Sequence, residues 1–333
     1  MSKTLMLAVL LLLAAAACAQ QLPLQTVADI PLPGRASRFD YQSFDPSSGR
    51  LYIAHLGDNT VVVFDTASRK VVGEVRDVKN VHGVLAVPAL HRIYASATGS
   101  NELVVIDDQT LKIAARVPAG EYPDGIAYAA DAKKLFVSDK TGKTVTVVDA
   151  ATNKPLSTIK MGGPVGNSQY DPTSGRIYSA VHKLNEIVEI DPVEEKIAAR
   201  YSLTDCRDPH GLLIDSPNRL AFAACEANAK LVVFDLAAGK QVAVFPVGGD
   251  PDVLALDNSL GRLYVACESG FVSIFDEQPG AQDKNRVLTP VASAFYAAKA
   301  HSVAADGKTR QIYFPLENVN GQPVLRIAQT PAR

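Results

Sequence analysis

The 333-residue sequence contains no tryptophan and only four cysteines, and its charges are balanced, with 33 Lys and Arg against 35 Asp and Glu. The absence of tryptophan excludes a tryptophan-derived quinone cofactor. Because no basic run is present, the chain lacks the electrostatic footprint of a nucleic-acid-binding protein. It also lacks a nucleophile elbow, a zinc-protease motif, a paired-cysteine metal motif and a dinucleotide fingerprint. No catalytic residue is therefore identified by motif.

Long apolar runs are scarce as well. The one clear run occupies residues 5–17, follows a single positive charge at Lys3 and ends in small residues. This is the build of a secretory signal peptide, and the run is too short to indicate a membrane span.

Two processing routes are compatible with this leader. Cleavage after Ala19 makes residues 1–19 the signal peptide and residues 20–333 a soluble single domain. Cleavage before Cys18 would instead place a lipid on that cysteine, as in bacterial lipoproteins. Both routes predict a periplasmic or secreted protein, and the second predicts one that is lipid-anchored to the outer membrane.

Three cysteines remain after the leader: Cys206, Cys225 and Cys267. An odd number in an oxidising compartment permits one internal disulfide and leaves a free thiol. Cys206 lies close to the expected end of the strand that carries Cys225, so these two form the candidate pair. The alternative is that all three are small buried thiols.

An internal repeat is the strongest pattern present. An apolar segment with one aromatic residue recurs seven times, from RLYIA at Arg50 to QIYFP at Gln311. The aromatic residues are Tyr52, Tyr94, Phe136, Tyr178, Phe222, Tyr264 and Tyr313, with spacings of 42, 42, 42, 44, 42 and 49. A second apolar segment follows each one, and six of these segments end in Asp65, Asp107, Asp149, Asp191, Asp235 and Asp276. We interpret these aspartates as caps of the following turns.

Each unit holds four short β-branched runs separated by turn-forming residues, which predicts an all-β fold: a seven-bladed β-propeller of four-stranded antiparallel blades. After the apolar run at residues 324–328 no further strand follows, whereas an unassigned strand at residues 26–31 precedes the first blade. We therefore expect the N-terminal strand to close the last blade. The longer final spacing predicts an insertion loop between Glu277 and Lys299, which includes Phe295 and Tyr296.

The segments LYIAH, LFVSD and LYVAC resemble the motif of the YVTN-type repeats found in secreted bacterial seven-bladed propellers. The resemblance covers essentially the whole mature chain and implies the same fold. It does not imply one function, because relatives of this architecture include binding proteins, lactonases, lyases and amine dehydrogenase subunits.

Twelve residues before each repeated aromatic, where the innermost strand of a blade begins, six of seven units carry Asp or His. These positions are Asp40, His82, Asp124, Gly166, His210, Asp252 and His301, with Asn167 beside the glycine. Because innermost strands line the axial channel, the pattern predicts a ring of these side chains at one mouth. The loops between second and third strands lie on the same face and carry His55, Asp139, His182, Glu226 and Glu268. Arg38 and Arg207, in loops leading into the ring, could neutralise its carboxylates.

Imidazole and carboxylate groups together suit zinc, iron, manganese or copper, so His82, His210 and His301 are candidate ligands of a divalent metal ion. Such an ion could lower the pKa of a bound water while a free carboxylate acts as base. The structural alternative is that these side chains bond to backbone amides and channel water and only close turns.

Three hypotheses follow. The first is an extracytoplasmic propeller that binds a small ligand, a metal ion or a partner through Asp40, His82, Asp124, Asn167, His210, Asp252, His301, Arg38 and Arg207. The second is a metal-dependent, lactonase-like hydrolase or lyase that uses the same residues. The third is a non-catalytic protein-interaction scaffold. No nucleic-acid partner is expected, and the membrane is reached only through a lipid on Cys18.

Overall fold

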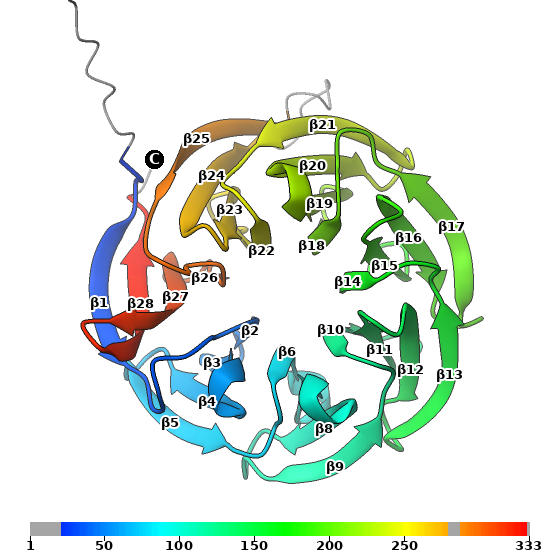
Figure 1. Ribbon diagram of the computed structural model, residues 1–333, viewed down its shortest axis with the longest axis horizontal. Coiled ribbons are helices and arrows are strands. Elements are labelled where there is room, and N and C mark those ends of the chain that lie inside the picture. Colours follow the sequence, from blue (N-terminus) through cyan, green and yellow to red (C-terminus); the bar gives the residue numbers. More distant parts are fainter. Residues whose placement is uncertain (1–20, 279–286, 332–333) are drawn as a thin grey trace, which may run out of the picture.

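The computed structural model describes residues 21–278 and 287–331, which form a closed ring of seven four-stranded antiparallel sheets (Figure 1). Adjacent blades meet through their innermost strands, and the last blade contacts the first. The predicted all-β, seven-bladed β-propeller is confirmed. The leader, including Cys18, lies outside the described residues. Within the two described ranges, no helix has both the length and the apolar character needed to cross a bilayer.

Each blade runs outward from the channel in chain order, and the last blade takes its outermost strand from the N-terminus. The strands of blades one to three are β2 (Gln42–Asp45), β3 (Arg50–His55), β4 (Thr60–Asp65), β5 (Lys70–Val75), β6 (Val81–Val87), β7 (Arg92–Ala97), β8 (Glu102–Asp107), β9 (Ile113–Pro118), β10 (Pro123–Ala129), β11 (Lys134–Asp139), β12 (Thr144–Asp149) and β13 (Lys154–Lys160). Those of blades four and five are β14 (Val165–Asp171), β15 (Arg176–Val181), β16 (Glu186–Asp191), β17 (Lys196–Ser202), β18 (Pro209–Asp215), β19 (Leu220–Cys225), β20 (Lys230–Asp235) and β21 (Lys240–Pro246). Those of blades six and seven are β22 (Pro251–Asp257), β23 (Arg262–Cys267), β24 (Phe271–Glu277), β25 (Leu288–Phe295), β26 (Ala304–Asp306), β27 (Gln311–Val319), β28 (Gln322–Gln329) and β1 (Gln25–Pro31).

Four short 3-10 turns complete the described structure. They are η1 (Leu56–Asp58), η2 (Pro88–Leu90), η3 (Thr98–Ser100) and η4 (Glu226–Asn228). Three of them, η1, η3 and η4, join the second strand of a blade to its third, on the face where the innermost strands begin.

The core lies between the blades. Second and third strands are apolar on both faces because each sheet stacks against a neighbour on either side. In β4, for example, all four residues from Val61 to Phe64 are fully buried. The seven repeated aromatics belong to this core and are at most 2% exposed: Tyr52, Tyr94, Phe136, Tyr178, Phe222, Tyr264 and Tyr313.

The ring is closed by the two ends of the described chain. Strand β1 pairs antiparallel with β28, with Thr26 opposite Ala328 and Ile30 opposite Leu325. The predicted N-terminal closure is therefore confirmed, and Figure 1 shows β1 on the outside of β28. Because β1 covers the outer edge of β28, that strand does not present a row of unpaired backbone groups.

The insertion between Glu277 and Lys299 is not a continuous loop, which corrects the sequence prediction. Leu288–Phe295 forms β25, the outermost strand of blade six, and it pairs with β24 along its length. Phe295 lies in this strand, opposite Phe271, whereas Tyr296 follows it. The segment is rich in residues compatible with a strand, and β24 requires a partner on its outer edge. Residues 279–286 of the insertion lie outside the described residues.

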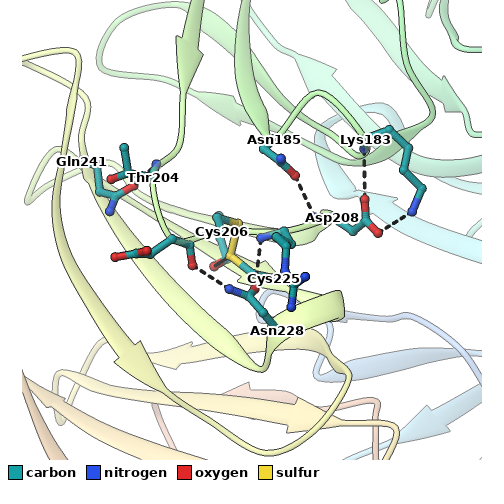
Figure 2. Close-up of a disulfide and its surroundings, with 11 residues drawn as sticks. Lys183, Asn185, Thr204, Cys206, Asp208, Cys225, Asn228 and Gln241 are labelled. Atoms are coloured by element: carbon teal, nitrogen blue, oxygen red, sulfur yellow. Dashed lines mark hydrogen bonds and ion pairs between the residues drawn. A yellow bond between two sulfur atoms is a disulfide. The ribbon is translucent and has the colours of Figure 1, made fainter.

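The candidate disulfide forms. Cys206 and Cys225 are bonded, with Cα atoms 5.3 Å apart, and Cys267 is a buried free thiol. The bond ties the loop that enters blade five to the end of β19 (Figure 2). Asn228 holds the same loop, since its Oδ1 accepts from Arg207 N at 3.0 Å and its Nδ2 donates to Asp205 O at 2.8 Å. The alternative of three separate thiols is wrong.

The aspartates that end the third strands cap turns, as expected from their repetition. In such a cap, a side-chain oxygen accepts a hydrogen bond from a backbone N–H three residues later. Five aspartates do this at 2.7–3.0 Å: Asp65, Asp107, Asp149, Asp191 and Asp235. Asp276 forms an ion pair with Arg262, with Nε and Oδ1 2.7 Å apart. These residues serve the fold.

Candidate functional site

Four innermost strands each deliver one polar residue to the same mouth of the channel. His82, Asp124, His210 and Asp252 each occupy the second position of an innermost strand, in β6, β10, β18 and β22. Asp40 lies just before β2, and its backbone N–H donates to Ala54 O at 2.9 Å. Because the repeat fixes the register of every blade, these side chains converge although the chain separates them.

Glycines allow the innermost strands to approach closely at this mouth. A Cβ on Gly83 would lie 2.1 Å from Asp124 O, and one on Gly211 would lie 1.8 Å from Asp252 O. Ser96 adds a direct link, since its hydroxyl donates to Asp124 O at 2.6 Å. The absence of side chains at the two glycines therefore sets the small diameter of the ring.

A cavity of about 490 Å³ lies at the mouth. Its lining is Arg38, Asp40, Leu56, Asn80, His82, Thr98, Gly99, Tyr122, Asp124, Lys140, His210 and Asp252. Six of the nine residues predicted for a ligand site therefore share one cavity. Small-molecule pockets measure roughly 300 to 1,000 Å³, so this volume suits a small ligand.

The other three predicted residues lie elsewhere. Asn167 lines a separate cavity of about 170 Å³, formed by residues further along the innermost strands. His301 is 1% exposed and faces backbone carbonyls with both ring nitrogens, Lys299 O at 3.0 Å from Nδ1 and Phe39 O at 3.0 Å from Nε2. Arg207 is exposed and is not among the residues lining the mouth cavity.

His210 is the centre of a group of carboxylates. Its Nε2 lies 3.3 Å from Asp124 Oδ2, and its Nδ1 lies 2.5 Å from Glu226 Oε1 and 3.3 Å from Asp252 Oδ1. His210, Asp124 and Asp252 are all buried. Three carboxylates from three blades therefore surround one imidazole at the edge of the cavity.

This arrangement controls the charge of the group. Burial and nearby Lys140 lower the pKa of His210, but its close contacts with the carboxylates of Asp124, Asp252 and Glu226 outweigh both and raise it well above its ordinary value. Burial likewise opposes ionisation of Asp124 and Glu226, yet His210 holds the pKa of both carboxyls below their usual range. The histidine is therefore an imidazolium at neutral pH when nothing else occupies the group.

His182 lies beside this centre and, unlike His210, is neutral. Its ring is 4.9 Å from that of His210, centroid to centroid, and its Nδ1 is 3.8 Å from Glu226 Oε2. Burial, followed by the charges of His210 and Lys140, lowers the pKa of His182 to about 3. A neutral imidazole therefore sits next to a charged one.

Several polar atoms around this centre are buried without a hydrogen-bond partner in the described part of the chain. They include His182 Nε2 and Asp124 Oδ1. His210 Nδ1 and Asp252 Oδ1 also lack an aligned hydrogen bond, but they form an ion pair with each other at 3.3 Å, and Glu226 Oε1 lies 2.5 Å from the same nitrogen. Most buried polar groups are paired, so the unpaired His182 Nε2 and Asp124 Oδ1 indicate a place where water, an ion or a ligand completes the structure.

On the other side of the cavity, His82 is held in one orientation. Its Nδ1 faces Asn80 O at 2.9 Å and Thr98 Oγ1 at 2.8 Å, and its Nε2 lies 2.9 Å from the Tyr122 hydroxyl. Asn80 O is an acceptor only, so Nδ1 donates to it, and Nε2 forms a hydrogen bond with the Tyr122 hydroxyl. Burial, with a smaller effect from the Asp124 charge, raises the pKa of Tyr122, which keeps that hydroxyl protonated.

Arg38 neutralises one part of the ring, as the sequence suggested. Its guanidinium lies 2.6 Å from Glu268 Oε1 and 3.3 Å from Asp40 Oδ2. Lys299 Nζ adds a second cation 3.1 Å from Glu268 Oε2. Burial raises the pKa of Asp40, and the Asp252 charge contributes to the same shift.

Lys140 and Tyr122 are cavity residues that sequence reasoning missed. Lys140 follows β11 in the same kind of loop as His182 and Glu226, and Tyr122 stands two residues before Asp124, as Arg38 does before Asp40. A comparison of equivalent positions in the repeated units could have identified both residues. In the residues that the structure describes, Lys140 Nζ has no ion-pair or hydrogen-bond partner. Burial lowers the pKa of Lys140, but the carboxylates of Asp124, Glu226 and Asp252 outweigh it and raise that pKa.

Two groups of side chains bring three potential ligand atoms within 4.8 Å of one another in the described ranges. One is His182, His210 and Glu226, and the other is Asp252, Glu268 and His301. The cations Arg38 and Lys299 already neutralise Glu268 in the second group. The three histidines predicted as ligands, His82, His210 and His301, do not form one such group.

The fold and the site define the class: a seven-bladed β-propeller with a His/Asp/Glu cluster, capable of binding a metal ion, at one channel mouth. No protein-family model and no curated protein matches the sequence. A chain of Kuenenia stuttgartiensis hydrazine synthase is similar in structure, with a TM-score of 0.74 at 16% identity over 92% of this chain and 99% of that one. U3-55K is similar with a TM-score of 0.76 at 11% identity over 91% and 99%. At these identities the likeness shows the propeller fold alone, and the YVTN resemblance has no support from a family match.

Proposed function

We propose that this protein is an extracytoplasmic binding propeller that takes up a small polar ligand with an anionic group in the mouth cavity. The observation that carries the proposal is Lys140, a cation that lines a cavity of about 490 Å³ without a partner for its ammonium among the described residues. Tyr122, Thr98 and Asn80 provide further polar lining around it. A ligand carboxylate or phosphate would pair with Lys140 and accept hydrogen bonds from neighbouring groups.

The location outside the cytoplasm is part of the same proposal. The signal-like leader at residues 1–19 supports it, and so does the Cys206–Cys225 disulfide, since such bonds persist in oxidising compartments. Intact mass of the protein purified from its native host distinguishes a chain that starts at Gln20 from one acylated on Cys18. A cytoplasmic, full-length chain with reduced cysteines contradicts the location.

The test of binding uses thermal unfolding with a panel of small mono-, di- and tricarboxylates and sugar phosphates. A bound compound stabilises the native state by RT ln(1 + [L]/Kd), which is about 2.7 kcal/mol at 100 times Kd. Lys140→Met should abolish the stabilisation, whereas Lys160→Met, a change at an exposed lysine on β13, should preserve it. Absence of any stabilising compound, or equal stabilisation of the Lys140→Met variant, contradicts the proposal.

A metal-dependent hydrolase or lyase is the second candidate. The close approach of His182, His210 and Glu226 favours it, because an ion there would border the cavity, and Asp252 lies beside it as a carboxylate able to move a proton. A lactone and ester screen on protein supplied with Zn²⁺ tests turnover. Activity that disappears in Asp252→Asn supports catalysis, and absence of turnover in the wild type leaves binding as the function.

A further inference from the structure

We infer that His182, His210 and Glu226 bind one divalent transition-metal ion, with zinc as the reference ion, and that Asp124 orients His210 for this role. The sequence analysis did not group these three residues as ligands of one ion. His182 and Glu226 belong to loops between strands, whereas His210 belongs to the ring. The inference rests on the proposed function only in its location, because the ion would border the cavity in which the ligand is proposed to bind.

The first argument is geometry. In a tetrahedral zinc site with bonds of about 2.0–2.2 Å, ligand atoms stand about 3.4 Å apart. The closest approaches here are 2.5 Å between His210 Nδ1 and Glu226 Oε1, and 3.8 Å between His182 Nδ1 and Glu226 Oε2. All three side chains have a ligand atom within 4.8 Å of the other two. Both closest approaches differ from the tetrahedral separation by less than about 1 Å.

The second argument is the unpaired nitrogen of His182 and the carboxylates around His210. His182 is 5% exposed, and its Nε2 has no hydrogen-bond partner among the described residues. His210 is 6% exposed, and its Nδ1 faces the carboxylates of Glu226 and Asp252 at 2.5 and 3.3 Å. A metal ion that replaces the proton on this nitrogen would be held by the nitrogen and the Glu226 carboxylate together.

The third argument is the partner of the other ring nitrogen. His210 Nε2 forms a hydrogen bond with Asp124 Oδ2 at 3.3 Å. Histidines that bind a metal almost always donate their second N–H to a carboxylate, carbonyl or water, which fixes the ring and increases its basicity. Asp124 is 1% exposed, so its position is fixed by the fold.

Local charge agrees with a divalent ion. With both imidazoles neutral, as ligands must be, the carboxylates of Asp124, Glu226 and Asp252 contribute three negative charges and Lys140 contributes one positive charge. The two negative charges that remain are neutralised by a divalent cation. Two imidazoles with a carboxylate is also a ligand set of zinc sites that keep one position open.

The test is isothermal titration of tag-free, chelator-treated protein with Zn²⁺, with Mg²⁺ and Ca²⁺ as hard-cation controls. The wild type should bind one Zn²⁺ per chain and neither control ion with comparable affinity. His182→Gln and Glu226→Gln should each weaken Zn²⁺ binding at least about tenfold, and Asp124→Asn by about 10- to 100-fold. His91→Gln, on the opposite rim, and Cys267→Ala should leave it unchanged.

Glu226 is partly exposed, so Glu226→Gln keeps the test usable if a histidine variant fails to fold, and circular dichroism verifies each variant. Absence of stoichiometric Zn²⁺ binding to the wild type overturns the inference, as does unchanged affinity in the folded Glu226→Gln variant. Lys140→Met separates the two proposals. It should abolish binding of the anionic ligand while Zn²⁺ affinity stays equal or increases, because a nearby positive charge is removed.

Discussion

Asp29 and Arg326 lie 297 residues apart in the chain and form a two-pronged ion pair across the strands that close the ring. Arg326 Nε and Nη2 donate to Asp29 Oδ1 and Oδ2 at 2.7 and 2.6 Å. The Arg326 guanidinium also lies over the ring of Tyr296, 5.8 Å from its centroid. One arginine therefore connects β28, β1 and the residue that follows β25.

This pair should contribute measurably to ring closure. Both side chains are only partly exposed and the contact is bidentate, so a coupling free energy of about 1 kcal/mol is expected. Urea unfolding of Asp29→Asn, Arg326→Gln and the double variant gives this value as a double-mutant cycle. Strictly additive effects would show that the two side chains do not cooperate.

Gly211→Ala should destabilise the protein by about 1–3 kcal/mol, because the new methyl group would overlap Asp252 O and force adjacent innermost strands apart. Gly249→Ala is the matched control, since a Cβ there finds its nearest neighbour 3.7 Å away. Chemical unfolding of both variants provides the comparison. Equal stability of the two variants would contradict the close-packed ring.

Glu277 should make stability depend on pH. Burial, strengthened by the Asp215 carboxylate, raises the pKa of Glu277 to about 8. In the unfolded chain a glutamate titrates near a pKa of about 4.3, so between these values the native state keeps a proton that the unfolded state has lost. The proton that Glu277 retains therefore stabilises the native state fully below about pH 4.3, and this stabilisation is lost as the pH rises through 8.

Glu277→Gln should remove this dependence and stabilise the protein by about 1–2 kcal/mol at pH 8, with a smaller effect at pH 5. Unfolding free energies measured from pH 5 to 9 test this expectation, with Glu194→Gln at an exposed site as the control. Parallel pH profiles of wild type and Glu277→Gln would disprove it.

The disulfide should stabilise the fold by constraining the unfolded chain. Cys206 and Cys225 are 19 residues apart, and a closed loop of that size is worth about 2–4 kcal/mol. The double variant Cys206→Ala/Cys225→Ala should lose this amount in denaturant unfolding. Reducing agent should lower the stability of the wild type by a similar amount and leave the double variant unaffected.

The sequence predicts the fold well because a repeat fixes blade number, strand order and register at once. The same register explains why His82, Asp124, His210 and Asp252 meet, since each stands at the second position of an innermost strand. Prediction from the repeat fails where one unit differs in length from the others. In blade six the longer insertion obscured β25, which is recognisable mainly through its pairing with β24.

The site is less predictable because side-chain direction and pairing are not fixed by register. His301 stands at an equivalent position, yet its ring turns to Phe39 O and Lys299 O. Asn167 is displaced by one residue from the ring position, and in a strand such a shift changes the side of the sheet on which a side chain lies. Glu226 is a candidate metal ligand only because His182 and His210, which belong to neighbouring blades, both lie close to it. No local sequence pattern predicts this proximity.

Pairing of β1 with β28 also imposes an order on biosynthesis. A ribosome releases the first strand long before it makes the last, so β1 has no partner while six blades are synthesised. Native circular topology is reached only after translation has passed β28, and a nascent chain that stops earlier leaves β1 without its native partner. Completion of the last blade is therefore a late step that depends on the full length of the chain.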